Sequence, residues 1–320
     1  MTTKALRSTL CMLALLAMPI SQASAADKLK LAISQKGQWD TAMAEFGMRE
    51  GFFRDEGLEL ELFYTNGTAE TQQAVISGSV DVGIGVGFLG LLAAYTKGAP
   101  VRVIASEWTG ASDFFWYVKS DSPVKSLADA DGKTIGFSTV GSSSNLVVLA
   151  LLDQYKVKAK PTPTGGTAAT MTQVLSGQID IGWSQAPIGL QEVKEGKLRI
   201  VAKGSDAKAM ADQTTRVSIS TADVLAAKRP ALERFMRAYN KTLDWAYGGT
   251  KSVEYFAAEL KIPFELALAA RDQNYPKDAL RLDVVRGLEQ TMQQAVELKR
   301  LSEPLTQQQT NELIQIIHAK

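Results

Sequence analysis

Cysteine and histidine are almost missing from this chain of 320 residues, which holds one of each, Cys11 and His318. Metal centres built on thiolate or imidazole ligands need more of these side chains, and so do catalytic pairs of serine or cysteine with histidine. A disulfide within one chain is also excluded, since it needs two cysteines. We therefore predict a protein without a metal, a cofactor or catalytic activity.

Excess charge of either sign is lacking as well, because 35 Lys and Arg residues oppose 34 Asp and Glu residues. A nearly neutral surface offers no electrostatic attraction for nucleic acid or for an acidic membrane. We expect neither of these partners, and we expect a monomer.

No long apolar run suggests a membrane span at the N-terminus. The apolar stretch at residues 10–20 is shorter than the roughly 20 residues that a spanning helix needs. It follows Lys4 and Arg7 and precedes the small residues 23–25, a pattern typical of secretory signal peptides. We predict that residues 1–25 are cleaved and that the mature protein is periplasmic.

What the chain does contain is a repeated phrase. "GTAETQQAVISGSVDVG" (residues 67–83) returns as "GTAATMTQVLSGQIDIG" (residues 166–182). Each copy predicts a helix, a glycine that ends it and a short apolar strand. We interpret Asp81 and Asp180, which the copies share, as turn residues rather than ligand contacts.

Further strands are predicted at residues 28–34, 58–64 and 133–138, with helical segments between them. Alternating strands and helices indicate α/β architecture, so we predict two similar lobes, each a mostly parallel sheet flanked by helices. The chain should cross between them near residues 105–120 and 203–218. We place lobe I at residues 26–118 and 211–320, with a helical C-terminal segment, and lobe II at residues 119–210.

Five stretches in order carry a resemblance to a known family: "GMREGFFRDEGLELEL" (47–62), "SGSVDVG" (77–83), "YVKSDSPVKSLADADGKTIGF" (117–137), "GSSSNLVVLALL" (141–152) and "GWSQAP" (182–187). With them the chain resembles the type II periplasmic solute-binding proteins of ABC importers. More narrowly, it resembles the nitrate, sulfonate and taurine family, which also includes binders of thiamine-type pyrimidines. The resemblance implies two lobes that close around a small-molecule solute and deliver it to an ABC permease with its ATPase.

Ligands of open parallel sheets bind beyond the carboxyl ends of the strands. Four loops meet that description, at residues 34–40, 85–90, 138–145 and 183–187. The predicted ligand-binding residues are Ser34, Gln35, Gln38 and Trp39 in the first loop, Gly87 and Phe88 in the second, Ser138, Gly141, Ser142, Ser143, Ser144 and Asn145 in the third, and Trp183, Gln185 and Pro187 in the fourth.

The third loop predicts an anion site, because three consecutive serines stand at the start of an apolar helix, whose free amides carry partial positive charge. The alternative is that Ser142 or Ser143 only caps the helix. Trp39 and Trp183 predict an aromatic wall, with core packing as the alternative. None of the four loops contains arginine, which favours a singly charged or neutral solute over a phosphate or dicarboxylate.

Three functions stay open on the sequence. The first is a periplasmic receptor for a small organic anion, such as a sulfonate or a carboxylate, that feeds an ABC importer. The second is a protein that binds or transforms a pyrimidine-type thiamine precursor. The third is a ligand-sensing partner of a membrane receptor.

Overall fold

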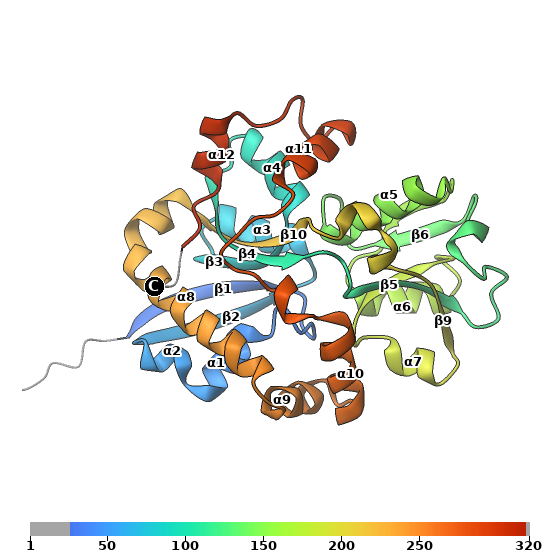
Figure 1. The fold of residues 1–320 in the computed structure, drawn as a ribbon, viewed down its shortest axis with the longest axis horizontal. Coiled ribbons are helices and arrows are strands. Elements are labelled where there is room, and N and C mark those ends of the chain that lie inside the picture. The colour runs from blue at the N-terminus through green and yellow to red at the C-terminus, as the bar shows by residue number, and fades with distance from the viewer. Residues whose placement is uncertain (1–25, 318–320) are drawn as a thin grey trace, which may run out of the picture.

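The computed structural model describes residues 26–317, and Figure 1 shows two lobes side by side. The predicted signal peptide, residues 1–25, lies outside the described residues. None of the helices within residues 26–317 combines the length and the hydropathy that crossing a bilayer requires.

The first lobe is built on a five-stranded sheet with the order β2-β1-β3-β10-β4. Its first three strands are parallel, whereas β10 runs antiparallel to both of its neighbours. The strands are β1 (Asp27–Ser34), β2 (Leu58–Thr65), β3 (Val82–Gly87), β4 (Val101–Thr109) and β10 (Thr214–Thr221). The helices of this part are α1 (Met43–Glu50), α2 (Phe52–Asp55), α3 (Thr68–Ile76) and α4 (Phe88–Thr96).

The second lobe repeats this strand order. Its strands are β5 (Phe114–Lys119), β6 (Thr134–Phe137), β7 (Lys160–Pro163), β8 (Gly182–Gln185) and β9 (Leu198–Lys203). Antiparallel β8-β5-β9 and parallel β6-β7 are joined by a parallel bridge from Ile135 to Ile181. The combined order β7-β6-β8-β5-β9 therefore matches that of the first lobe, position for position. The helices are α5 (Ser143–Tyr155), α6 (Thr167–Leu175) and α7 (Leu190–Lys194), with short 3-10 turns η1 (Leu127–Asp129), η2 (Gly204–Asp206) and η3 (Lys208–Met210).

The C-terminal segment is helical and packs on the first lobe (Figure 1). It consists of α8 (Ala222–Tyr247), α9 (Lys251–Leu260), α10 (Phe264–Asn274), η4 (Lys277–Ala279), α11 (Leu288–Glu297) and α12 (Gln307–Leu313). Helix α8 lies against α1 and α2, α11 against α4, and α12 beside β4.

The predicted two-lobed α/β fold is confirmed, with antiparallel strands where the chain changes lobe. Parallel neighbours need a crossover connection, whereas β5 and β10 are entered directly from the other lobe. All ladder partners of β5 lie in the second lobe, although the boundary predicted after residue 118 assigns most of β5 to the first. We propose instead that the chain crosses at residues 110–113 and 204–213.

The aspartate of the repeated phrase links β3 to β1 in the first lobe and β8 to β6 in the second. The carboxylate of Asp81 accepts the backbone N–H of Lys30 at 2.9 Å, and that of Asp180 accepts the N–H of Thr134 at 2.8 Å. A threonine pair repeats too, with hydroxyl oxygens 2.7 Å apart in each lobe: Thr65 with Thr71, and Thr164 with Thr170. Both aspartates therefore serve the structure of the turn.

Replacing Asp81 by alanine is expected to lower the free energy of unfolding by about 1–3 kcal/mol, because the N–H of Lys30 loses its acceptor. The neutral variant Asp81→Asn keeps an acceptor oxygen and serves as the control. Urea unfolding followed by circular dichroism measures both. A loss of solute affinity in a fully stable Asp81→Ala protein would contradict the structural role.

Candidate functional site

A small pocket lies between the lobes, at the carboxyl ends of β1, β3, β6 and β8. The first lobe contributes Ser34, Gln35, Gln38, Thr68, Gly85 and Arg216, and the second contributes Phe114, Ser138, Ser142, Ser143, Ser144, Trp183 and Gln185. Both lobes therefore supply side chains to one site, as expected from the four loops.

Most of the predicted residues meet at this cavity, but several do not. The structure brings together Ser34, Gln35, Gln38, Ser138, Ser142, Ser143, Ser144, Trp183 and Gln185. It does not bring Trp39, Gly87, Phe88, Gly141, Asn145 or Pro187 to the cavity wall. The sequence interpretation missed Thr68, Gly85, Phe114 and Arg216.

Trp39 belongs to the core of the first lobe. Its ring packs edge-on against Phe46, Tyr247 and Phe256, and its indole N–H donates to the hydroxyl of Tyr247 at 3.0 Å. The aromatic side of the cavity is instead formed by the second lobe, where the rings of Trp183 and Phe114 lie 5.9 Å apart. The prediction that Trp39 forms an aromatic wall is therefore wrong, and the alternative, packing in the core, is correct for this residue.

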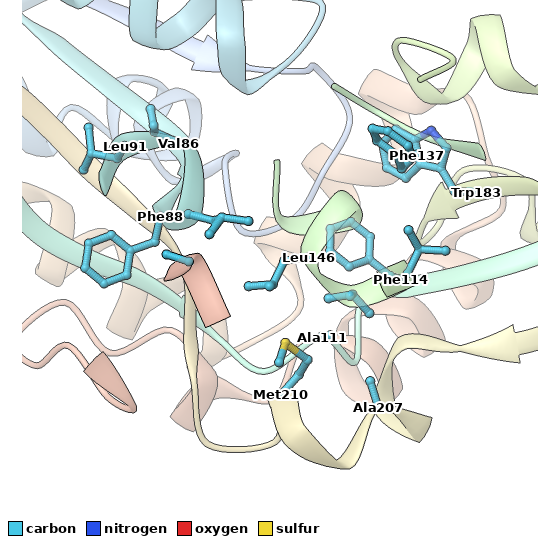
Figure 2. Packing of buried hydrophobic residues seen from close by; sticks show 14 of the residues in the cluster. Val86, Phe88, Leu91, Ala111, Phe114, Phe137, Leu146, Trp183, Ala207 and Met210 are labelled. Atoms are coloured by element: carbon cyan, nitrogen blue, oxygen red, sulfur yellow. The ribbon is translucent and has the colours of Figure 1, made fainter. Parts of the chain in front are cut away.

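Phe88 is fully buried in an apolar cluster that also contains Leu91 and, from the second lobe, Leu146 (Figure 2). Asn145 supports the third loop from within, because its side-chain oxygen accepts the N–H of Gly141 at 3.0 Å. These side chains shape the walls behind the cavity and do not reach into it.

The three serines at the start of α5 differ in what they do. The hydroxyl of Ser142 accepts the N–H of Asn145 at 3.2 Å and caps the helix, and that of Ser144 accepts the N–H of Ser138 at 3.0 Å. The hydroxyl of Ser143 lies 3.5 Å from Nη1 of Arg216. Since the first amides of a helix have no acceptor inside it, the positive end of α5 meets the cavity.

Two buried polar groups in the cavity wall have no partner within the described part of the chain. They are the amide nitrogen of Gln38, from the first lobe, and the hydroxyl of Ser138, from the second. Each residue is only 3% exposed. Because a buried polar group without a partner is costly, these two groups indicate where a solute would bind.

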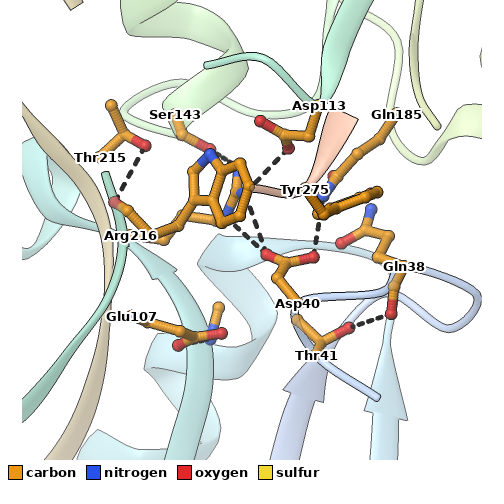
Figure 3. A network of polar contacts seen from close by, with 12 residues as sticks. Gln38, Asp40, Thr41, Glu107, Asp113, Ser143, Gln185, Thr215, Arg216 and Tyr275 are labelled. Atoms are coloured by element: carbon orange, nitrogen blue, oxygen red, sulfur yellow. Dashed lines mark hydrogen bonds and ion pairs between the residues drawn. The ribbon is translucent and has the colours of Figure 1, made fainter. Parts of the chain in front are cut away.

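Arg216 is the cation of the site and is held by two carboxylates (Figure 3). Its Nε donates to Asp40 at 3.0 Å and its Nη2 to Asp113 at 2.8 Å. The other oxygen of Asp40 accepts from the amide of Gln185 in the second lobe at 3.1 Å. The guanidinium carbon lies 5.1 Å from the ring centroid of Phe114. The network therefore joins both lobes and the crossing between them.

Arg216 reaches the cavity because β10 is antiparallel. Its position opposite Gly87 places the start of β10 at the edge where β1 and β3 end. Arg216 lies near the start of a strand, so it is not among the loops that follow strands. The available signal was a lone arginine within "TTRVSIST", whose other residues are neutral.

Two carboxyl groups near Arg216 are buried, and burial raises their pKa values. Burial, together with the nearby charge of Asp40, raises the pKa of Glu107 to about 8. Burial also raises the pKa of Asp113, which Arg216 opposes. The positive features left to a solute are the end of α5 and Nη1 of Arg216.

No three His, Cys, Asp or Glu side chains among the described residues are grouped so that they could hold a metal ion. Lys36, a cation in the first predicted loop, forms an ion pair with Glu259 and lines a separate pocket.

Solved structures share this fold. The alkanesulfonate-binding protein SsuA from Xanthomonas axonopodis pv. citri, bound to MOPS, is 18% identical with a TM-score of 0.71, covering 85% of this chain and 90% of that one. The periplasmic nitrate-binding protein NrtA from Synechocystis PCC 6803 is 14% identical with a TM-score of 0.68, covering 90% of this chain and 85% of that one. These likenesses establish the type II periplasmic-binding-protein fold.

Curated relatives carry a different name. The 4-amino-5-hydroxymethyl-2-methylpyrimidine phosphate synthase THI12 of Saccharomyces cerevisiae is 24% identical over 160 residues, which are 50% of this chain and 46% of that protein. The chain thus spans about half the length of the curated relatives that it matches. The sequence model of the family described as NMT1/THI5 like matches residues 46–249, well over half of the chain. The chain therefore belongs to the NMT1/THI5 like family.

Proposed function

We propose that this chain is the solute-binding component of an ABC importer, exported to the periplasm by a cleaved signal peptide and active as a monomer. It captures a small organic anion, a sulfonate or a carboxylate, between its lobes. The observation that carries the proposal is one cavity lined by the positive end of α5, Nη1 of Arg216 and two unpartnered groups from opposite lobes.

Several groups that only donate hydrogen bonds face that pocket. They are the side-chain nitrogen of Gln38, the guanidinium of Arg216 and the backbone N–H groups that begin α5. A group that only accepts, such as a carboxylate or a sulfonate, is complementary to them. The rings of Trp183 and Phe114 provide apolar area for the rest of the solute.

One negative charge is the charge that we assign to the solute. Arg216 already faces Asp40 and Asp113, so a second charge on the solute would add repulsion in a buried site. The bound anion would take the place of solvent at Nη1 while Asp40 and Asp113 keep the guanidinium in position.

A pyrimidine-type solute is the second candidate, and the names of the curated relatives favour it. A flat ring would stack on Trp183, and the amides of Gln38 and Gln185 would bind its edge. Catalysis on such a ring is the less favoured form of this candidate, because the charged groups at the cavity floor are paired with one another.

Native mass spectrometry of protein taken from its own host, followed by identification of the released solute, tests these functions. A monoanionic acid supports the first candidate and a pyrimidine the second. A change in the mass of the solute during incubation with the protein would contradict a role limited to binding.

Replacing Ser143 by aspartate is expected to abolish capture of the identified anion while the protein stays folded. The new carboxylate would stand at the start of α5 beside Arg216, where a like charge repels the solute and favours the helix end by about 0.3–2 kcal/mol. Calorimetric titration measures the affinity, and Ser143→Asn is the neutral control of the same shape. An unchanged affinity of Ser143→Asp would remove this loop from the site.

A further inference from the structure

The two lobes meet at a place where neither carries a side chain. Gly87 and Gly90, at the start of α4, face Gly141, which precedes α5 in the second lobe. The backbone N–H of Gly90 donates to the carbonyl oxygen of Gly141 at 3.0 Å. We call Gly87, Gly90 and Gly141 the glycine seam.

A β-carbon on any residue of the glycine seam would collide with backbone of the other lobe. On Gly87 it would lie 2.9 Å from the carbonyl oxygen of Gly141, and on Gly90 it would lie 3.0 Å from the same oxygen. On Gly141 it would lie 2.9 Å from the Cα of Gly90. These distances are shorter than ordinary van der Waals contacts of a β-carbon, and backbone cannot rotate away as a side chain can. A side chain at Gly87 or Gly141 would therefore require backbone of one lobe to shift, and one at Gly90 would require the carbonyl of Gly141 to give way by a few tenths of an ångström.

Gly90 shows that contact with the other lobe, and not backbone conformation, is what requires glycine here. It is a helical residue of α4, a position at which alanine is the better helix former. What excludes a side chain is the carbonyl of Gly141 in front of it.

The glycine seam lies against the loop that begins α5. The β-carbon position of Gly87 is within 3.0 Å of both the Cα of Ser142 and the backbone nitrogen of Ser143. The N–H of Gly87 in turn donates to the hydroxyl of Thr68, a residue of the cavity wall, at 2.5 Å. No residue of the seam lines the cavity itself.

Building on the proposed function, we propose that Gly90 is a positioning residue for solute capture. The glycine seam lets α4 of the first lobe receive the carbonyl of Gly141, which seats the start of α5 against the opposite lobe. The approach of the two lobes then also completes the anion site, although no residue of the glycine seam touches the solute.

The test measures how readily the two lobes come into contact, through a disulfide formed between them. It uses the full chain with one cysteine in each lobe, Asn66→Cys and Gly166→Cys, and with the native cysteine removed by Cys11→Ser. A β-carbon at position 166 lies 3.6 Å from the backbone oxygen of Asn66, so the two substituted positions adjoin across the lobes. The rate of disulfide formation under a mild oxidant reports this arrangement without any solute. Gly90→Ala is compared with Gly249→Ala, where an added β-carbon meets no atom within 4 Å.

We expect Gly90→Ala to slow disulfide formation about tenfold, equivalent to about 1.4 kcal/mol, and Gly249→Ala to leave the rate unchanged. Equal rates for the two variants would overturn the proposal. The melting temperature of Gly90→Ala should stay the same or rise, since alanine favours the helix. A melting temperature that falls together with the rate would assign Gly90 a merely structural role.

Calorimetric titration with ethanesulfonate separates this proposal from the proposed function. Weaker binding to Gly90→Ala than to Gly249→Ala supports both, and equal binding overturns the role of the seam. No binding to the parent chain, with disulfide formation still slowed by Gly90→Ala, contradicts a sulfonate receptor while supporting the seam as the closing contact.

Discussion

Replacing Arg216 by methionine is expected to lower the free energy of unfolding by about 3–5 kcal/mol, enough to unfold a marginal domain. The change leaves Asp40 and Asp113 without their counter-ion, and neither side chain has contact with solvent. Methionine keeps much of the apolar contact with Trp108 and Phe114, so the loss reports the charge. Urea unfolding at neutral pH, followed by circular dichroism, measures it.

Two further variants show whether unpaired charge is the cause. Arg216→Met combined with Asp40→Asn and Asp113→Asn should recover most of the lost stability, because no buried charge is left without a partner. Arg229→Met removes an exposed arginine paired with Glu233 and should cost about 0–1 kcal/mol. A triple variant no more stable than Arg216→Met alone would contradict this explanation.

Stability is expected to fall by roughly 4–5 kcal/mol as the pH rises from about 4 to 9, through the titration of Glu107. Its pKa in the folded protein is about 8, against an ordinary value of 4.5, because its carboxyl group is buried near Asp40. The folded state therefore holds a proton that the unfolded state has released. The stabilisation is complete below the unfolded pKa and is lost as the pH rises through the folded pKa.

The variant Glu107→Gln should remove the share of this pH dependence that comes from Glu107, while the raised pKa of Asp113 leaves a smaller slope of the same sign. One oxygen of Glu107 accepts the N–H of Gly85 at 2.7 Å and the hydroxyl of Ser218 at 3.1 Å, and glutamine retains such an oxygen. Urea unfolding at pH 5, 7 and 9 gives the slope for each variant. Glu61→Gln, on the exposed face of β2, should keep the parent slope. Parallel slopes for Glu107→Gln and Glu61→Gln would contradict the assignment.

The repeated phrase made the fold predictable, because a glycine stop followed by Asp and an apolar strand has a local physical meaning in each copy. The loops after β1, β6 and β8 were predictable for the same reason, since a parallel strand shows its direction through the helix that follows it. Arg216 was not, because its strand runs the other way and only the pairing of β10 with β3 brings it to the cavity.

Trp39 illustrates a second limit. A tryptophan between Gln38 and Asp40 has polar neighbours in sequence, which favours exposure, yet the first lobe covers it with Phe256 and Tyr247 from the C-terminal helices. Those partners lie more than 200 residues away in the sequence. Whether an aromatic residue faces a solute or a core thus depends on residues far away in the sequence, which the local sequence pattern does not reveal.

The matching strand orders have a consequence for how the molecule is assembled. If β1 to β5 are taken as one unit and β6 to β10 as the next, each unit gives its fifth strand to the sheet of the other, at the same place between the third and fourth strands. Strand β5 of the first unit thus lies in the second sheet, and strand β10 of the second unit lies in the first sheet. The two units have exchanged one strand, as two copies of a protein do in a domain swap. The first sheet cannot be completed until residues 214–221 have been synthesised, because β10 pairs with both β3 and β4. These two strands therefore stay without their shared neighbour while the second lobe is synthesised.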